Sequence, residues 1–346
     1  MASGCTQKAA EGSIVPFSSV DDVQTLLGAQ RYVCNRRLAT VVYLASRLDK
    51  PILVEGPAGV GKTELGKAVA GALERKLIRL QCYEGLDETK ALYEWEYGKQ
   101  LLYTHVLRGR IDVALERARD LREAAETLRW HEDVFFNEDF LVARPVLQSI
   151  REKHPTVLLV DEIDRADEEF EAFLLELLSD YQVTIPELGT LRARSIPLVV
   201  LTSNATRELS EALKRRCFHV YLGYPRMDVE LEIVRLKTPG LREELADQMV
   251  DMIHQLRALD LRKAPSVGET LDWAQALVAL QASDLSKELI VETLGVIIKH
   301  DRDAQKVISY LEGAPPETSF GQAEIGEIPD SFLEAKRRPA LRPGER

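Results

Sequence analysis

The sequence feature that most constrains the fold is a glycine-rich segment at residues 56–63. It reads Gly56-Pro57-Ala58-Gly59-Val60-Gly61-Lys62-Thr63 and fits the pattern G-x-x-x-x-G-K-[ST] completely. The apolar run at residues 51–55 predicts a buried strand before it, and apolar residues at helical spacing predict a helix that begins near Lys62. A strand, a glycine-rich turn and a helix in this order are typical of an α/β fold that binds phosphate.

The same segment predicts the contacts of a nucleotide. Glycines at positions 56, 59 and 61 let the backbone curl so that consecutive N–H groups point at phosphate oxygens, and the helix adds the positive end of its dipole. We expect Lys62 to reach the β- and γ-phosphates of ATP and the Thr63 hydroxyl to ligate Mg²⁺. A glycine-rich turn without a ligand is the alternative, and the flanking strand, helix and Lys-Thr pair disfavour it.

An acidic motif follows a second apolar run. Residues 157–164 read Val-Leu-Leu-Val-Asp-Glu-Ile-Asp, so a predicted strand ends in two adjacent carboxylates. We expect Asp161, at the tip of the strand, to hold Mg²⁺ directly or through water. Glu162 is then placed to act as general base on the attacking water. A solvated acidic turn is the alternative, and the position of the motif after residues 56–63 favours the ATPase interpretation.

Two further polar clusters follow. The strand predicted at residues 197–202 leads to Asn204, which can orient the lytic water or touch the γ-phosphate; an Asn that only caps a turn is the alternative. Residues 211–217 contain three consecutive cations at a predicted helix end. There Arg215 or Arg216 can act as an arginine finger for a neighbouring subunit, or can simply stabilise the helix C-terminus.

Apolar periodicity and proline content divide the chain into segments of different predicted structure. We expect a disordered lead-in at residues 1–19, an α/β nucleotide-binding domain at residues 20–225, an all-helical domain at residues 226–312 and a mobile, proline-rich tail at residues 313–346. A charged, amphipathic helical insert is expected at about residues 105–150, either facing water or touching a partner. Other predicted elements of the α/β domain are one or two helices in residues 20–48, strands at 77–82 and 156–160, a helix at 168–180 and a β-hairpin of 182–185 with 191–194.

Composition restricts the partners. The net charge is −11, from 45 basic and 56 acidic side chains, which argues against nucleic acid as the main partner but leaves room for a positive pore lining in an acidic oligomer. The longest apolar runs are too short to span a bilayer, and residues 1–13 lack the apolar core of a signal peptide. Cysteines at positions 5, 34, 82 and 217 form no CxxC pair, so neither a zinc site nor a disulfide framework is expected, and a reducing cytoplasm is favoured.

These motifs together resemble those of an AAA+ ATPase. The resemblance depends, in order and spacing, on residues 56–63, residues 157–165, Asn204 and residues 213–216. It implies a three-layer α/β sandwich with a parallel sheet and a small helical lid, which would assemble into a ring, usually a homo-hexamer, with ATP and Mg²⁺ at the subunit junctions. By position Arg216 best matches the finger of the family, and Arg215 is its close competitor.

Within that family the chain is similar to the MoxR branch in Asp161–Ala166, Phe173–Leu178 and Gln182–Ile185, and to the CoxD-like group in Ala264–Leu277. The resemblance implies a chaperone that matures or remodels a client protein, often with a partner that carries a von Willebrand factor A domain. For CoxD-like members the client is a molybdenum hydroxylase such as carbon monoxide dehydrogenase, whose metal centre is matured.

The lid departs from the pattern of the family. The second-sensor arginine commonly follows Ser-Pro near the start of a lid helix, and residues 263–269 have no arginine at the matching place. Arg262 or Lys263 can reach the γ-phosphate instead, or sensing by the lid is weak; both alternatives stay open here.

Three functions fit these residues. An ATP-driven remodelling chaperone is the leading hypothesis, a nucleic-acid-associated AAA+ motor or loader is the second, and a scaffold that binds ATP but hydrolyses little is the third. The acidic net charge disfavours the motor. The presence of Lys62, Asp161, Glu162 and Asn204 disfavours the scaffold.

Overall fold

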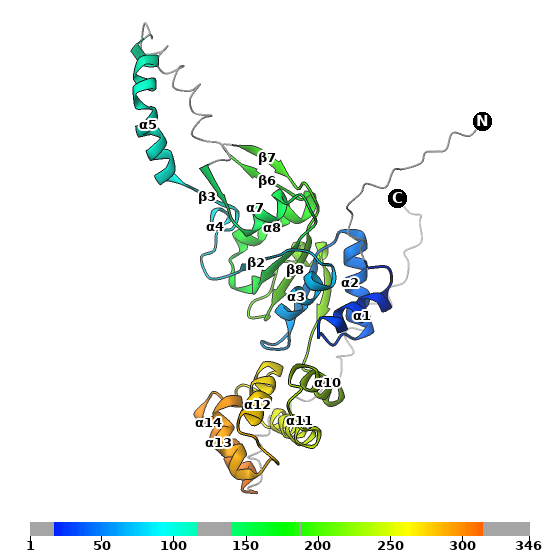
Figure 1. Cartoon of the computed structure of the whole chain (residues 1–346). Helices are drawn as coiled ribbons and strands as arrows, with labels where there is room; N and C mark the ends of the chain where they lie inside the picture. The colour runs from blue at the N-terminus through cyan, green and yellow to red at the C-terminus, as the bar shows by residue number, and fades with distance from the viewer. Residues whose placement is uncertain (1–16, 117–139, 187, 314–346) are drawn as a thin grey trace, which may run out of the picture.

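The computed structural model describes residues 17–116, 140–186 and 188–313. A five-stranded parallel sheet forms the centre of the α/β domain (residues 17–225), and the order of its strands is β2-β5-β8-β1-β9 (Figure 1). The expected parallel α/β fold is therefore confirmed. The strands are β1 (Ile52–Glu55), β2 (Leu77–Gln81), β5 (Val157–Asp161), β8 (Leu198–Ser203) and β9 (Phe218–Tyr221).

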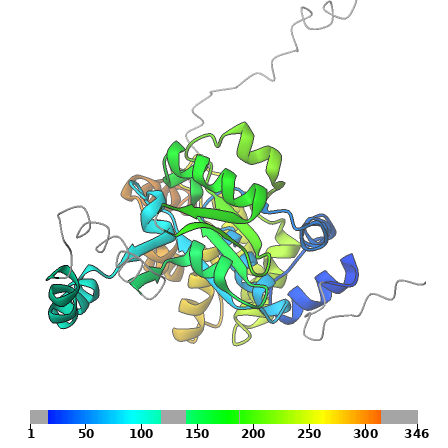
Figure 2. The ribbon, with the colours of Figure 1, turned by 90° about the horizontal axis from the view of Figure 1, so that it is seen from above.

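Strand β5 shows why both faces of this sheet are covered. All of its residues are buried, and alternate side chains enter two different apolar clusters, with Leu159 in one and Leu158 in the other. The first cluster is completed by α1 (Val20–Ala29), α2 (Arg36–Leu48) and α3 (Lys62–Ala72). The second is completed by α7 (Pro145–Arg151), α8 (Glu168–Asp180) and α9 (Glu211–Arg216). Helices thus lie on both sides of the sheet, as the view from above shows (Figure 2).

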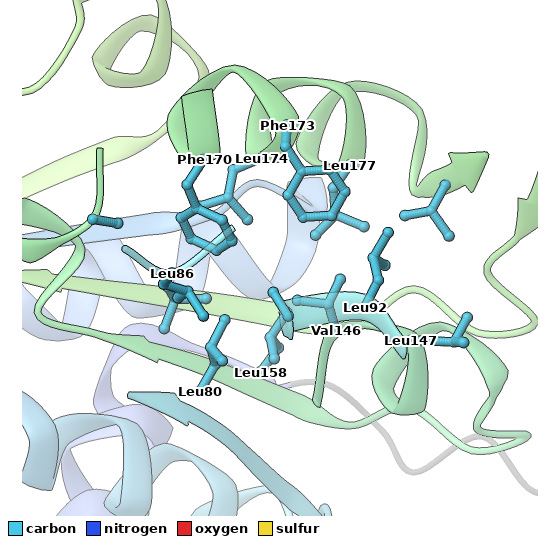
Figure 3. Close-up of a cluster of buried hydrophobic side chains, with 14 of the residues drawn as sticks. Leu80, Leu86, Leu92, Val146, Leu147, Leu158, Phe170, Phe173, Leu174 and Leu177 are labelled. Carbon is cyan, nitrogen blue, oxygen red and sulfur yellow. The ribbon is translucent and has the colours of Figure 1, made fainter. Parts of the chain in front are cut away.

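Helix α8 anchors the second cluster. It spans the residues predicted from sequence and begins where the Asp167 side chain accepts the Phe170 N–H at 3.1 Å. Phe170 and Phe173 project from it toward Leu158 of β5 and Leu80 of β2 (Figure 3). Each such side chain contributes about 1.5–3 kcal/mol when fully buried, so this packing holds β5, and with it the acidic motif, in place.

The N-terminal boundary differs from the expected lead-in at residues 1–19. Phe17 is buried in the first cluster, and the Ser19 hydroxyl accepts the Asp22 N–H at 3.0 Å as the N-cap of α1. The ordered domain therefore includes residues 17–19, because an aromatic side chain and a helix cap fix them. The rest of the lead-in, residues 1–16, and the tail from residue 314 lie outside the described residues.

The helical insert expected at residues 105–150 is also placed differently. Helix α5 (Tyr97–Glu116) begins earlier and projects away from the sheet (Figure 1). It follows α4 (Glu88–Leu92) and β3 (Tyr93–Trp95), and β3 pairs antiparallel with β4 (Leu141–Ala143). Strand β4 and helix α7 pack on the core through buried apolar residues, so residues 141–150 belong to the α/β domain. The part of the expected insert at residues 117–139 lies outside the described residues.

The rest of the chain follows the predicted pattern closely. Strands β6 (Gln182–Ile185) and β7 (Gly189–Arg192) pair antiparallel, which confirms the hairpin with its second strand two residues earlier than expected. Between residues 227 and 311 the structure is helical and has its own apolar core around Trp273 (Figure 1). This helical domain consists of α10 (Met227–Lys237), α11 (Glu243–Ala258), α12 (Val267–Ala279), α13 (Lys287–Ile297) and α14 (Asp301–Leu311).

None of the helices in the described ranges has the length and apolar character that a membrane crossing requires.

Candidate active site

The polar motifs meet at a cavity of about 890 Å³ beyond the carboxyl ends of β1, β5 and β8. Its α/β wall includes residues 58–64 after β1, Asp161 and Glu162 at the end of β5, and Asn204 after β8. Residues from α10 and α12 line the opposite wall, so the cavity lies between the two domains. A volume in the range of several hundred Å³ suits a ligand of nucleotide size.

The glycine-rich loop is held by contacts that leave no room for side chains at two positions. Gly56 has φ 151°, and a Cβ there would come 1.9 Å from the Leu222 carbonyl oxygen. Gly59 has φ 76°, and a Cβ there would come 2.3 Å from the Ser266 hydroxyl. The carbonyl of Gly59 also accepts the Gly268 N–H at 3.1 Å, at the start of α12. The loop is therefore packed directly against the helical domain.

Lys62 is the first residue of α3, directly after the glycine-rich loop. Its ammonium donates to the carbonyl oxygens of Gly56 and Pro57 and to Oδ1 of Asn204, each at 2.7 Å. Burial lowers its pKa, and the nearby carboxylates, Asp164 first among them, oppose that shift. Because its acceptors are neutral oxygens, the ammonium gains electrostatically by exchanging them for phosphate oxygens.

Asp161 is the most enclosed acid of the site. Its carboxylate accepts the Thr63 hydroxyl at 2.9 and 3.0 Å and the Thr202 hydroxyl at 2.5 Å. Arg79 of β2 donates to its second oxygen through Nε at 3.1 Å and Nη2 at 2.5 Å. Sequence reasoning missed Thr202 and Arg79; the charge of Arg79 within a predicted strand is unusual, but it does not indicate the partner of this residue.

Glu162 sits on a strained turn directly after β5. Its φ of 57° is uncommon for a residue with a side chain, and its N–H donates to the Thr202 hydroxyl at 2.9 Å. This turn directs the residue to the cavity, where its carboxylate forms an ion pair with Arg165 at 2.7 Å. Its side chain is 30% exposed, so water can reach the carboxylate.

Asn204 is positioned by Asp164. The Asp164 carboxylate accepts the N–H groups of Asn204 and Thr206 at 3.1 Å each and the Thr206 hydroxyl at 2.5 Å. Burial alone would raise the pKa of Asp164, but these hydrogen bonds outweigh burial and lower it. Asn204 is therefore fixed by an ionised carboxylate, and the structure brings Lys62, Asn204 and the acidic motif into one cluster.

A model of the ATPase family associated with various cellular activities (AAA) matches residues 52–225. The chain belongs to this family. It is an ATPase, and its AAA domain is the α/β domain described above.

Other similarities are more distant. An uncharacterized protein of Staphylococcus epidermidis is 24% identical over 278 residues, which cover 77% of this chain and 91% of that protein. An uncharacterized protein of Staphylococcus haemolyticus is 22% identical over 277 residues, with 77% and 90% covered. Among solved structures, a RuvB mutant of Thermotoga maritima has a TM-score of 0.44 at 15% identity and covers 87% of this chain and 82% of its own. The Thermotoga maritima RuvB Holliday junction branch migration motor has a TM-score of 0.39 at 16% identity, with 82% and 73% covered.

The two candidate finger arginines of this AAA ATPase lie away from its own cavity. Arg215 and Arg216 are exposed in the last turn of α9, and neither lines the cavity. Nε of Arg216 donates to the Ser179 hydroxyl at 2.8 Å, and Nη1 donates to the Ala212 carbonyl at 3.2 Å. The structure therefore does not bring these arginines together with the residues that surround Lys62.

The structure places neither candidate for the second sensor at the cavity. Lys263 donates to Glu269 at 2.9 Å, and the backbone N–H groups of Arg262 and Lys263 bind the Asp303 carboxylate; neither residue lines the cavity. Glu269 is committed to the capping box of α12, which draws the lysine toward it. The cations that do line the cavity from α10 and its N-cap are Lys237 and Arg226, and sequence reasoning missed both.

Aromatic and apolar side chains also line the cavity. They are Tyr32, Leu38, Tyr224 and Leu271, together with Cys34. Burial raises the pKa of the Cys34 thiol to about 12 and raises the pKa of Tyr32 as well, so both groups stay neutral near pH 7. Uncharged aromatic side chains of this kind suit the flat ring of a nucleobase.

The residues present also fit a magnesium ion. Thr63 and Asp161 place hydroxyl and carboxylate oxygens, which are hard ligands, within 3.0 Å of each other at the cavity wall. Among the residues that the structure describes, no group of three His, Cys, Asp or Glu side chains could hold a metal by itself. Two protein oxygens suit Mg²⁺, which keeps several waters and takes further ligands from the phosphates of its nucleotide.

Proposed function

We propose that this AAA ATPase works as a homo-hexameric ring in the cytoplasm and uses the energy of ATP hydrolysis to remodel a client protein. The position of Arg216 carries the proposal for a ring. This arginine is exposed in α9 and does not line its own cavity, so it can complete the cavity of a neighbouring subunit by exchanging its hydrogen bonds to Ser179 and Ala212. Arg215 remains the competing candidate, because it lies in the same exposed turn.

The chemistry follows from the side chains of the cavity. Lys62 exchanges its neutral acceptors for phosphate oxygens, and Asn204, held by Asp164, orients the attacking water. Glu162 accepts a proton from that water, whose oxygen then attacks the γ-phosphorus while ADP departs. Thr63 and Asp161 would hold Mg²⁺, which neutralises phosphate charge when it is bound. The guanidinium of a neighbouring Arg216 stabilises the charge that develops on the transferred phosphoryl group.

A protein client is supported by the surface of α5. Helix α5 projects from the α/β domain (Figure 1). Its residues Tyr97, Leu101, Leu102 and Val106 are between 60% and 74% exposed, and none of them lines the ATP cavity. Apolar side chains of this kind and the net charge of −11 favour a protein over nucleic acid as the substrate.

The identity of the client is proposed on resemblance. Asp161–Ala166 and Phe173–Leu178 are similar to the MoxR branch, and Ala264–Leu277 is similar to the CoxD-like group. We propose on that basis that the client is a metalloenzyme under maturation, of the class of molybdenum hydroxylases such as carbon monoxide dehydrogenase. A protein with a von Willebrand factor A domain is the proposed partner.

Subunit mixing tests the ring and the finger together. Lys62→Ala subunits keep Arg216 but lose phosphate binding, whereas Arg216→Ala subunits keep the cavity but lose the finger. Each variant alone should hydrolyse ATP about 10³-fold more slowly or worse, because a finger contributes 10³–10⁵ in turnover. In a mixture, ATP turnover should reappear, since Lys62→Ala subunits supply Arg216 to intact cavities.

The mixing experiment has a direct control. The double variant Lys62→Ala/Arg216→Ala, mixed with Arg216→Ala, should restore nothing because no subunit supplies the arginine. If Arg216→Ala alone keeps wild-type turnover, Arg216 is not the finger, and the same series with Arg215→Ala tests its competitor. If single variants lose activity and no mixture restores it, the arginine does not act between subunits.

The class of substrate is tested by what stimulates hydrolysis. Single- or double-stranded DNA and RNA should leave turnover unchanged within about twofold, and strong stimulation by either would favour the nucleic-acid motor instead. The variant Leu101→Ser/Val106→Ser should hydrolyse ATP at the basal rate, since α5 does not line the cavity. Purified molybdenum hydroxylase, presented in its immature form, should stimulate the wild type but not this variant.

A further inference from the structure

Arg79 contacts a residue of the active site but has no role in the ATPase mechanism described above. It lies on β2, the strand next to β5, and its Nε and Nη2 both donate to one oxygen of Asp161. The Asp161 side chain is 3% exposed, whereas the Arg79 side chain is 46% exposed. Asp161 is thus buried in the fold, whereas Arg79 reaches solvent.

This ion pair balances a charge that would otherwise be costly to bury. The other donors to Asp161 are the hydroxyls of Thr63 and Thr202, which are neutral. A buried carboxylate with only neutral donors is strongly disfavoured relative to one with a cation beside it. Arg79 therefore supplies a positive charge in direct contact with the carboxylate of the metal-free site, and the nearby Lys62 ammonium adds a second, more distant one.

The same carboxylate is the proposed ligand of Mg²⁺, directly or through water. A divalent ion and a guanidinium on one carboxylate repel each other, and at about 6 Å in a water-like medium this repulsion lowers the affinity for the ion about tenfold. Arg79 already has a second acceptor, because its Nη2 donates to Oε1 of the exposed Gln81 at 2.5 Å. The guanidinium can move toward Gln81 and solvent without losing every partner.

We propose that Arg79 is a positioning residue that takes the place of Mg²⁺ on Asp161 and gives way toward Gln81 when the ion enters. This inference rests on the magnesium site proposed above. It makes occupancy of the site depend on the free concentration of Mg²⁺, because the ion must displace a cation rather than enter an empty anionic site. It also keeps Asp161 aligned with Thr63 between catalytic cycles.

The test is equilibrium binding of a fluorescent, non-hydrolysable ATP analogue at a fixed concentration while free Mg²⁺ is titrated. Arg79→Gln should lower the Mg²⁺ concentration at half-maximal binding by about three- to tenfold, because the competing charge is gone. Arg79→Lys keeps the charge and should stay within about twofold of the wild type. If Arg79 merely oriented Asp161, Arg79→Gln would raise that concentration instead, and this result would overturn the proposal.

A second variant protects the test against a folding defect in Arg79→Gln. Gln81 is exposed, so Gln81→Ala should fold normally; it removes the acceptor toward which Arg79 moves. The half-maximal Mg²⁺ concentration should then rise about two- to threefold, opposite in sign to Arg79→Gln. An unchanged value in Gln81→Ala would contradict the proposed movement.

Two controls separate this inference from the magnesium site itself. Arg144→Gln removes an arginine that is equally exposed, at 46%, but pairs with the exposed Glu94, and it should leave the Mg²⁺ titration unchanged. Asp161→Asn should remove most of the dependence on Mg²⁺. If the wild type shows no such dependence, the magnesium site is wrong. If Asp161→Asn removes it while Arg79→Gln shifts nothing, only the role of Arg79 is wrong.

Discussion

Each domain contains a buried carboxylate paired with an arginine, and the two arginines differ in their exposure to solvent. Asp161 of the AAA domain pairs with Arg79, which is 46% exposed, whereas Glu230 of the helical domain pairs with Arg257, which is 8% exposed. Both acids are almost fully buried, at 3% and 0% exposure of their side chains. The first pair has one member that can leave for solvent; the second has none.

The pair in the helical domain is a closed network. Glu230 accepts from both terminal nitrogens of Arg257 at 2.5 and 2.7 Å, from Thr270 at 2.8 Å and interacts with His254 at 2.9 Å. Its arginine also donates to the carbonyl of Pro265, just before α12, and stacks on Tyr224 in the cavity wall. Full satisfaction of this kind fixes the shape of a domain, whereas a pair open to the cavity can change partner when a ligand arrives.

The largest effect should follow from breaking the closed network. Arg257→Ala leaves Glu230 as a buried charge without its bidentate partner, and this should lower the free energy of unfolding of the helical domain by about 3–5 kcal/mol. Urea unfolding measures the loss when it is followed by the fluorescence of Trp273, which is fully buried in that domain, in a background where Trp95 and Trp130 are replaced by Phe.

An exposed arginine of the same domain provides the comparison. Arg242 is 58% exposed and pairs with Glu244 at 3.6 Å, so Arg242→Ala should change the unfolding free energy by less than about 0.5 kcal/mol. Equal losses in Arg257→Ala and Arg242→Ala would show that the buried network has no special part in holding the domain.

In the AAA domain, a substitution next to Asp161 should change the rate of ATP hydrolysis rather than the stability of the fold. Glu162→Gln removes the proposed base next to Asp161 and should lower the turnover of ATP by about 10²–10³-fold, because general-base catalysis contributes at that level. The affinity for ATP should stay within about threefold, since Lys62 and the glycine-rich loop are unchanged. Single-turnover hydrolysis and equilibrium binding of ATP measure the two quantities separately. Hydrolysis at the wild-type rate would remove Glu162 from the role of base.

The phosphate side of the cavity could be predicted from the sequence because its residues are close in the chain. Lys62 and Thr63 are adjacent at the start of α3, directly after a loop whose glycines are required by local geometry, and Asp161 and Glu162 are adjacent at a strand end. Arg79 could not be assigned in this way. Its contact with Asp161 joins residues 82 positions apart and depends on the register of β2 with β5, which no local pattern specifies.

The helical side was predicted less well for a related reason. Its contribution comes from side chains on α10 and α12, whose positions depend on how the domain packs against the glycine-rich loop. Lys263 was a plausible sensor by sequence position, but the capping box formed by Glu269 draws it away. Strand β9 was also missed, because a four-residue segment with a single buried residue gives little periodicity.

The smallest expected effect compares the two acids by the same chemical change, carboxylate to amide. Glu230→Gln leaves the buried Arg257 without an anionic partner. This should lower the free energy of unfolding of the nucleotide-free protein by about 2–3 kcal/mol. Asp161→Asn should cost about 1 kcal/mol or less, because the half-exposed Arg79 can turn to Gln81 and water. Urea titrations of both variants, followed by circular dichroism, measure the difference. If Asp161→Asn lowers the free energy of unfolding as much as Glu230→Gln does, then Arg79 cannot leave its carboxylate. The ion pair of Asp161 would then be as closed as that of Glu230.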